Sequence, residues 1–418
     1  MPGDATDDRE ANPRKPEPVG ERQRIAALDV LRGLALLGIL GMNIRSFAGP
    51  FSTYLNPLVM YDYSGISRLA YWVTTLLFDT KMISLFSMLF GAGALLYAEK
   101  RSEPEVSTTR LWYRRNVWLL LIGLAHAYLV WEGDILVVYS LCGLLFVWWT
   151  RRLSVRALVI LSAAMFSVGG FLSIGHAAGF ADQPPAAQAE ELALWQPSAG
   201  QLADEVNVYR DGYFGIVKHR APLAFVAHTL FFVVFFLWRA GGMMVLGQGL
   251  LKSGVLTGGR TIRFYRALAI VGYAVGFPLV WTGQWQLEAA EFAVPQRFTL
   301  DLYNYFGSIA VALGHVGLVL WLYRSRTLPG CFDRLAAVGR MALTNYLMQS
   351  LICTTLFYGY GCGLFGRLNY AWQLVVVIAI WVLQLLVSPW WLKRHPFGPA
   401  EWFWRRLTYR ARPPITRV

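Results

Sequence analysis

Long apolar runs recur through the whole chain, and short segments rich in lysine and arginine separate them. About 20 apolar residues cross a bilayer as a helix, and only helices and closed barrels satisfy their backbone hydrogen bonds there. The runs are too long for the alternating strands of a barrel. The sequence therefore predicts an all-α fold, a polytopic transmembrane helix bundle of about ten spans. The predicted spans are 27–47, 76–98, 113–131, 134–150, 156–178, 223–250, 264–284, 303–323, 338–360 and 370–392.

The composition agrees with a membrane protein and excludes an ordinary soluble domain. Of the 418 residues, 56% are hydrophobic and 15% are charged, whereas soluble domains carry about 25% charged residues. The net charge of +13 does not indicate a nucleic-acid partner, because the chain has no nucleic-acid-binding motif and its basic residues form short clusters between apolar runs. The four cysteines show no metal-ligand spacing. We therefore expect the lipid bilayer as a partner, with no metal and no permanently bound cofactor.

The distribution of positive charge predicts the orientation. If both termini are cytoplasmic, 28 of the 38 Lys and Arg residues lie in cytoplasmic segments, 7 lie in outer segments and 3 lie within spans. Cytoplasmic loops of membrane proteins carry such an excess. The prediction is a disordered cytoplasmic tail at 1–23, a transmembrane domain at 24–392, and a cytoplasmic aromatic and basic tail on lipid headgroups at 393–418.

Two segments depart from the simple pattern of spans and short loops. The long outer loop 179–222 begins with a stretch of disordered composition and then, at 202–220, predicts an amphipathic helix on the outer face. The segment 66–98 is too long for one span, so its first part is expected to lie along the outer surface before turning inward at 79–81.

Ionisable groups inside a span are costly and mark functional or paired positions. The stretch "HAYLVWEGDILVVY" places His126 just inside the outer end of one span and Asp134 at the start of the next. The hairpin between them is short enough for Asp134 to fold back to the imidazole, and a histidine oriented by a carboxylate is the arrangement of a general base. The competing interpretation is a packed histidine and a helix-capping aspartate. Both remain open, and Glu132 and Tyr139 are further candidates at the same site.

Three arginines are candidates for binding an anion on the cytoplasmic side. Arg32 stands three residues from Asp29 on one helix face, so the two form either an interfacial ion pair or an anion site oriented by the carboxylate. Arg239 lies within a span that holds no carboxylate, and Arg340 lies at a cytoplasmic rim.

Other polar positions within the spans have structural and functional interpretations. Lys81 is expected to extend to the outer surface, and Gly91 and Gly93 to allow close helix packing. The remaining polar candidates for substrate contact or helix packing are Asn43, Asn345 and Gln349.

Several ordered motifs resemble the YeiB-like bacterial membrane proteins, a family of unknown function, over nearly the whole chain after residue 24. These motifs are "RIAALDVLRGLALLGILGMNI", "KMISLFSMLFGAG", "HAYLVWEGDILVVYSLCGLL", "VGRMALTNYLMQS" and "FGPAEWFWRRLTY". The resemblance implies a multi-pass protein of the bacterial inner membrane.

More remotely, the opening Leu28-Asp29-Val30-Leu31-Arg32-Gly33 resembles the transmembrane acyltransferases, which include heparan-α-glucosaminide N-acetyltransferase and OafA-type O-acyltransferases. Those enzymes carry an acyl group from cytoplasmic acyl-CoA to a sugar on the other face. They have a catalytic histidine in or near the first outer loop, whereas 48–66 contains none here. The base proposed for this chain, His126, is therefore argued from its position alone.

The resulting prediction is an acyltransferase with acyl-CoA as co-substrate and a glycan or small molecule as acceptor. The same arginines and the pair of His126 and Asp134 would also suit a transporter or flippase for an anionic solute, with the pair as a proton relay. A third alternative is a non-catalytic assembly partner in which all these groups serve packing.

Overall fold

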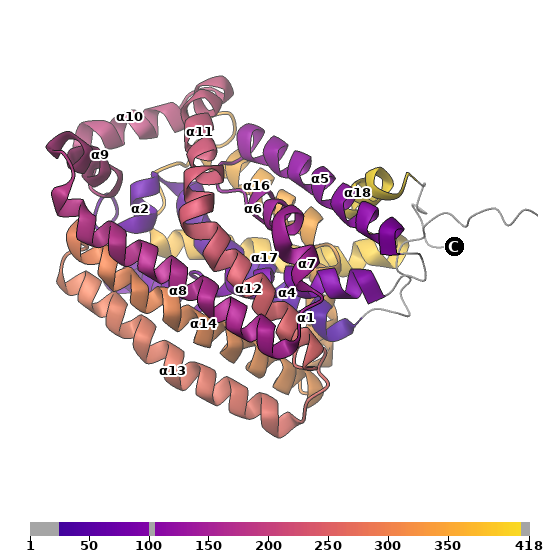
Figure 1. Cartoon of the computed structure of the whole chain (residues 1–418). Coiled ribbons are helices and arrows are strands. Elements are labelled where there is room, and N and C mark those ends of the chain that lie inside the picture. The colour runs from indigo at the N-terminus through magenta and orange to yellow at the C-terminus, as the bar shows by residue number, and fades with distance from the viewer. Residues whose placement is uncertain (1–24, 100–104, 411–418) are drawn as a thin grey trace, which may run out of the picture.

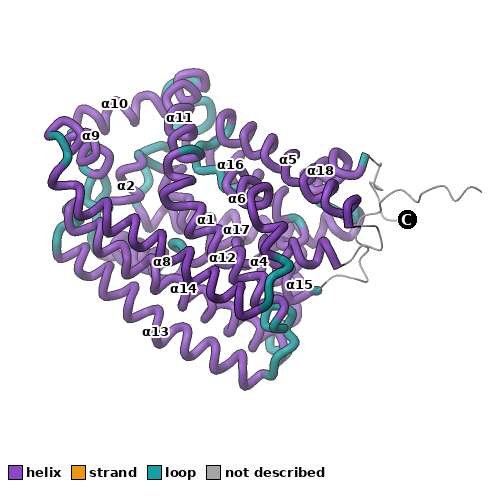
Figure 2. Tube along the Cα trace, in the orientation of Figure 1, coloured by secondary structure: helices purple, strands orange, loops and turns teal. Residues whose placement is uncertain are grey.

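The computed structural model describes residues 25–99 and 105–410, and every regular element in these ranges is a helix (Figures 1 and 2). The predicted all-α fold is confirmed. The predicted tail 1–23 and positions 411–418 lie outside the described residues. The α-helices are α1 Ala26–Ala48, α2 Phe51–Leu55, α3 Gly65–Leu77, α4 Lys81–Glu99, α5 Glu105–Leu129, α6 Leu136–Cys142, α7 Trp148–Thr150, α8 Val155–Gly179, α9 Pro185–Trp195, α10 Ala199–Arg210, α11 Tyr213–His228, α12 Leu237–Lys252, α13 Ile262–Ala289, α14 Val294–Arg324, α15 Pro329–Arg340, α16 Ala342–Phe357, α17 Tyr370–Arg394 and α18 Pro399–Tyr409. Shorter π and 3-10 segments are η2 Gly143–Val147, η3 Phe180–Asp182 and η4 Phe232–Phe236.

Seven helical stretches in the described part of the chain are long and apolar enough to cross a membrane. Each coincides with a predicted span, and their apolar residues define a bundle that resides in the bilayer. The seven are Ala26–Ala48, Gly65–Glu99, Val155–Asp182, Tyr213–Lys252, Ile262–Ala289, Arg297–Arg324 and Tyr370–Arg394.

The other three predicted spans are not among these seven. The span 113–131 overlaps α5, which ends at Leu129, and 134–150 matches the shorter apolar stretch Leu136–Thr150. The span 338–360 is broken at Met341, where α15 ends and α16 begins. The total of ten spans and the cytoplasmic location of both termini therefore stay predictions.

Helix α1 lies inside the bundle. Most of its residues are buried, and it packs against α3, α4, α14, α15, α16 and α17. On the outside, α13 packs along α14, and α8 packs against α12 and α14 (Figure 1). Because α13 leaves many large apolar side chains exposed, it forms part of the surface that the bilayer covers.

The loops gather at two ends of the bundle. One end, which we call the basic end, contains 25–26, 105–115, 151–156, 252–262, 324–342 and 393–410. Here Arg114 donates to the Leu407 carbonyl at 2.6 Å and the Trp404 indole to the Arg115 carbonyl at 2.9 Å, so α18 is held on α5 (Figure 1).

The opposite end contains 48–64, 130–135, 179–213, 289–297 and 358–370. Here the Gly366 N–H bonds the Ala48 carbonyl at 2.7 Å, and Arg210 bonds the Phe365 carbonyl at 2.8 Å. Segments predicted to share a side of the membrane therefore contact one another.

Two segments of the opposite end differ from or refine the prediction. Helix α9 falls largely within the stretch predicted to be disordered, where Pro185 at its first turn has a backbone geometry suited to starting a helix. The predicted amphipathic helix at 202–220 is two helices, α10 and α11, because the chain leaves helical geometry at Asp211 and Gly212. The turn predicted at 79–81 is present, with α3 ending at Leu77 and α4 starting at Lys81.

Candidate functional site

The side chains of His126 and Asp134 are in direct contact. His126 lies in the last turn of α5, Asp134 lies just before α6, and 2.7 Å separate the imidazole Nδ1 from the carboxylate Oδ2. Both residues are buried, with exposed fractions of 3% and 6%. The contact requires Nδ1 to carry the proton when the ring is neutral, so the other nitrogen, Nε2, has a free lone pair.

The Asp134 carboxylate also accepts a hydrogen bond from the backbone. Its Oδ1 accepts the Val137 N–H at 2.8 Å and so satisfies a donor at the start of α6. The Nε2 atom of His126 is buried and has no hydrogen-bond partner among the described residues. The aromatic ring of Tyr346 lies 5.2 Å from the imidazole, centroid to centroid. Asp134 thus combines the capping role and the orienting role that the sequence left as alternatives.

The nearby candidates Glu132 and Tyr139 have different partners. Glu132 accepts a hydrogen bond from the Tyr209 hydroxyl at 3.1 Å, and burial raises the pKa of its carboxyl. The Tyr139 hydroxyl is 2.9 Å from Ser87 Oγ on α4. Among the described residues, neither side chain is hydrogen-bonded to the pair of His126 and Asp134, which we call the dyad. Asn43 is half-buried on α1.

The three candidate arginines do not gather at one place. Arg32 pairs with Asp29 at 2.7 Å, about 9 Å along α1 from its start at the basic end. Arg340 is the last residue of α15, also at the basic end. Arg239 instead lies near the start of α12, about 20 Å along the helix from Lys252 at the basic end. Arg239 therefore does not lie with Arg32 and Arg340 at the basic end, where the sequence analysis grouped the three.

The polar pair on α16 joins this helix to α17. Asn345 donates to Ser388 Oγ at 3.0 Å, and Gln349 donates to Gln384 Oε1 at 2.9 Å. Gln384 in turn donates to the Asn345 carbonyl at 2.9 Å. This arrangement fits the interpretation of these residues as polar contacts between packed helices.

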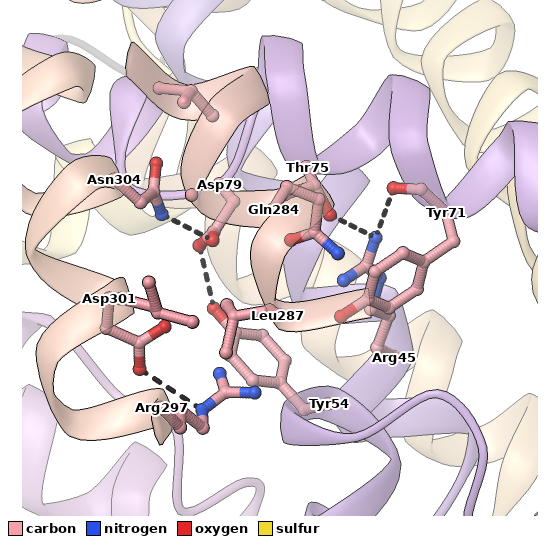
Figure 3. A pocket seen from close by; sticks show the side chains of 13 residues that line it. Arg45, Tyr54, Tyr71, Thr75, Asp79, Gln284, Leu287, Arg297, Asp301 and Asn304 are labelled. Atoms are coloured by element: carbon pink, nitrogen blue, oxygen red, sulfur yellow. Dashed lines mark hydrogen bonds and ion pairs between the residues drawn. The ribbon is translucent and has the colours of Figure 1, made fainter. Parts of the chain in front are cut away.

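A polar pocket, not predicted from the sequence, lies at the opposite end between α1, α2, α3, α13 and α14 (Figure 3). It contains about 400 Å³ of space, its opening included. Figure 3 shows Arg45 on one side and the Arg297–Asp301 pair on the other, with Asp79 and Gln284 between them. The lining residues are Arg45, Tyr54, Tyr71, Thr75, Asp79, Val280, Gly283, Gln284, Leu287, Arg297, Leu300, Asp301 and Asn304.

Each charged group of the pocket is held by a different set of partners. Arg45 Nη2 donates to the Tyr71 carbonyl at 2.8 Å and to the hydroxyls of Thr74 and Thr75, and its guanidinium lies 3.8 Å from the centre of the Tyr71 ring. All of these partners are uncharged. Arg297, by contrast, forms an ion pair with Asp301 at 3.1 Å and also donates to the Leu55 carbonyl.

Lys81 connects the pocket to the interior of the bundle. Its ammonium group donates to Asn304 Oδ1 at 2.6 Å and to the Thr75 carbonyl at 2.8 Å, and the side chain is fully buried. Asn304 then donates to Asp79 Oδ2 at 2.9 Å. The expectation that Lys81 extends to the outer surface is wrong, because these buried acceptors satisfy the ammonium group inside the protein.

The polar column continues one turn deeper. Arg239 donates to Ser84 Oγ at 2.8 Å and to Ser308 Oγ at 2.5 Å. Its Nε and Nη1 are buried and have no hydrogen-bond partner among the described residues. Arg239 therefore belongs with Lys81 and Asn304 in a column between α4, α12 and α14.

The sequence contained a signal for this column. Arg297, Asp301, Asn304 and Ser308 are spaced by four, three and four residues, which places them on one face of α14. Lys81, Ser84 and Ser87 repeat at intervals of three on α4. Examining each polar residue alone missed these two stripes, which face each other in the structure.

The dyad and the pocket lie on different sides of α1. Ile44 and Phe47 of α1 pack in one apolar cluster with Trp131, which follows α5. Arg45, between them in sequence, points instead to α3. The pocket lining does not include His126 or Asp134.

The apolar helices and their buried polar groups define the class, a multi-pass α-helical membrane protein. The chain belongs to the YeiB family. It is 33% identical over 403 residues to the uncharacterized protein YeiB of Escherichia coli strain K12, which covers 94% of this chain and 98% of that protein. It is 30% identical over 413 residues to the uncharacterized protein YxaH of Bacillus subtilis strain 168, covering 96% of this chain and 98% of that protein. A family described as "Protein of unknown function (DUF418)" matches residues 250–411. The predicted resemblance to YeiB-like proteins is confirmed.

Proposed function

We propose that the protein is an acyltransferase of the bacterial inner membrane that uses acyl-CoA and a glycan or small-molecule acceptor. The observation that carries the proposal is the contact between His126 Nδ1 and Asp134 Oδ2 at 2.7 Å, with Nε2 left without a partner among the described residues. When a carboxylate holds one ring nitrogen as a hydrogen-bond donor, the tautomer and orientation of the ring are fixed. The other nitrogen can then act as a general base.

In the proposed reaction, Nε2 of His126 takes the proton of an acceptor hydroxyl or amine. The acceptor atom then forms a bond to the thioester carbonyl carbon, and the resulting oxyanion collapses with cleavage of the carbon–sulfur bond. The imidazolium returns its proton to the leaving thiolate, so the products are the acylated acceptor and free CoA. Because Nε2 is buried, turnover requires the residues that cover it to move aside for the acceptor.

The basic end would bind the phosphates of the acyl donor. Arg32 has a half-exposed side chain and shares a close helix crossing with α15, which ends at Arg340. Guanidinium groups bind phosphate oxygens in a bidentate manner. In this proposal Asp29 orients Arg32 through their 2.7 Å contact.

The direct test uses the full chain in proteoliposomes with labelled acetyl-CoA and candidate acceptors. Acceptor-dependent release of CoA is expected, and His126→Ala should reduce it by roughly 10²–10⁴-fold. A matched control is His176→Ala, since His176 also contacts a carboxylate, Glu191 Oε1 at 2.6 Å, but at the exposed surface. Equal loss in both variants, or full activity of His126→Ala, would refute the role of His126.

A second candidate is transport of an anionic solute, and the buried column supports it. Lys81 and Arg239 lie successively deeper in the bundle than the pocket. Two nitrogens of Arg239 have no hydrogen-bond partner among the described residues. Buried cations in a bundle mark ion or substrate pathways. Accumulation of unmodified solute in the same vesicles, without release of CoA, would support transport in place of acyl transfer.

A further inference from the structure

We propose that the pocket at the opposite end binds an anionic oxygen group, a phosphate or a carboxylate, between Arg45 and Arg297. This inference does not depend on the proposed acyl transfer, because the pocket and the dyad lie on different sides of α1. It rests on the charges around the pocket, on an unused hydrogen-bond donor in its wall, and on its size.

Two further cations lie beyond the lining of the pocket. The lining residues include two cations, Arg45 and Arg297, and two carboxylates, Asp79 and Asp301. Lys81 and Arg239 lie deeper and bond uncharged groups. These two additional positive charges in a low-dielectric interior favour an anion in the adjoining pocket.

Arg45, which lines the pocket, has no carboxylate among its hydrogen-bond partners in the described residues. Its hydrogen bonds go to one carbonyl and two hydroxyls, and it is 2% exposed. All three bonds involve Nη2, and a guanidinium has five N–H donors in a planar fork. The fork can therefore bind two oxygens of one anionic group while Nη2 remains fixed to α3.

Gln284 supplies an independent sign of a missing ligand. Its side chain lines the pocket, is 7% exposed, and has an amide nitrogen with no hydrogen-bond partner among the described residues. A buried donor without an acceptor is costly. An oxygen of the ligand held by Arg45 would satisfy it, as Figure 3 shows both groups in the wall of the same pocket.

The size and the remaining wall define the chemical class of the ligand. The space of about 400 Å³ includes the open mouth of the pocket, so the enclosed part holds only a small group. Asp79 faces the pocket as an acceptor that already binds Tyr54 at 3.2 Å and Asn304 at 2.9 Å. The pocket therefore suits the anionic head of a compact polar ligand, such as a hydroxylated acid or a phosphate ester, and not a long apolar chain.

The test measures the thermal stability of the full chain in nanodiscs of zwitterionic lipid, titrated with inorganic phosphate or with glucuronate at constant ionic strength set by chloride. Saturable stabilisation is expected for at least one probe. Arg45→Gln should weaken the apparent affinity at least tenfold. Arg68→Gln is the control, because Arg68 is an exposed arginine at the same end that pairs with Glu288 at 2.6 Å.

A second variant keeps the test informative if Arg45→Gln does not fold. Asp301→Asn removes the counter-charge of Arg297 and should tighten the affinity for the same probe several-fold. Opposite changes in Arg45→Gln and Asp301→Asn support an electrostatic site in the pocket. No saturable effect of either probe on the wild type, or unchanged affinity in both variants, would overturn the proposal.

The origin of the anionic group is resolved by the lipid composition. If the group belongs to a lipid headgroup, nanodiscs with phosphatidylglycerol should weaken the effect of the soluble probe at least tenfold in the wild type and leave Asp301→Asn the tightest binder. If the group belongs to a solute, the titration should be the same in both lipid compositions.

Discussion

Glu401 and Thr344 cap each other's helices at the basic end. The Glu401 carboxylate accepts the N–H groups of Leu343 and Thr344 at 2.7 and 3.1 Å, at the start of α16. The Thr344 hydroxyl donates to the same carboxylate at 2.6 Å and accepts the N–H of Ala400 at 3.0 Å, at the start of α18. Two helix starts that are far apart in sequence thus satisfy one another's free donors.

We expect this reciprocal cap to be energetically coupled. Glu401→Ala and Thr344→Ala should each lower the free energy of unfolding by about 1–3 kcal/mol, because each leaves buried N–H groups without an acceptor. The double variant should cost less than the sum by about 1 kcal/mol. Denaturant unfolding in micelles measures the cycle. Arg406→Ala, on the exposed face of α18, should stay within about 0.5 kcal/mol, and strict additivity would show that the two residues act separately.

The crossing of α4 and α12 depends on glycine. A Cβ on Gly91 would lie 1.9 Å from the Met244 carbonyl oxygen, and one on Gly247 would lie 2.0 Å from that of Met88. Gly91→Ala should therefore destabilise the protein by about 1–3 kcal/mol, measured as a lower melting temperature of the purified protein. Gly93→Ala is the matched control, because no heavy atom lies within 4 Å of a Cβ there. Equal melting temperatures would contradict the close crossing.

Lys81 should contribute to stability as a buried donor. Lys81→Met leaves Asn304 Oδ1 and the Thr75 carbonyl without their donor, so we expect a loss of about 1–3 kcal/mol. A lysine that merely extended to the surface would cost less than about 0.5 kcal/mol when replaced. Lys218→Met, at an exposed lysine of α11, provides that reference in the same thermal assay.

Glu205 should make stability depend on pH. Burial raises the pKa of its carboxyl from 4.5 to about 7, while its Oε1 accepts the Phe51 N–H at 3.3 Å. The folded chain therefore holds a proton that the unfolded chain releases, and this residue's contribution falls as pH rises from about 4.5 to about 7. Glu205→Gln should match the wild type near pH 4.5 and be more stable above pH 7. Parallel melting curves across this window would contradict the raised pKa.

The two roles of Asp134 should separate in Asp134→Asn. Asparagine is a good helix cap, so the bond from its oxygen to the Val137 N–H can persist and stability should change by less than about 1 kcal/mol. The amide cannot orient the imidazole as the carboxylate does, so acyl transfer should fall by about 10²–10⁴-fold. A melting temperature and a CoA-release assay on the same preparation test both statements.

The sequence predicted the elements that follow from hydropathy alone. Apolar length located every helix that is long enough to span the membrane, and the polar turn at 79–81 was correctly placed between α3 and α4. The short hairpin between α5 and α6 indicated that Asp134 could fold back towards His126, but the contact itself is a finding of the structure. Each of these inferences depends on neighbours in the chain.

The features that the sequence did not predict depend on distant neighbours. The break at Met341 is stabilised by Glu401 from α18, so no local pattern reports it. Lys81 can be buried because Asn304 on α14 accepts its hydrogen bond, and only the two polar stripes considered together indicate this pairing. Gly93 was expected to allow close packing like Gly91, but no heavy atom of the described residues lies within 4 Å of a Cβ built there.

Helix α1 lies between the two polar regions. Ile44 and Phe47 support the wall next to Trp131, and Arg45 forms part of the pocket. Rotating or sliding this helix would move all three side chains at once. A ligand that displaces Arg45 would therefore act on the same helix that carries the apolar wall beside Trp131.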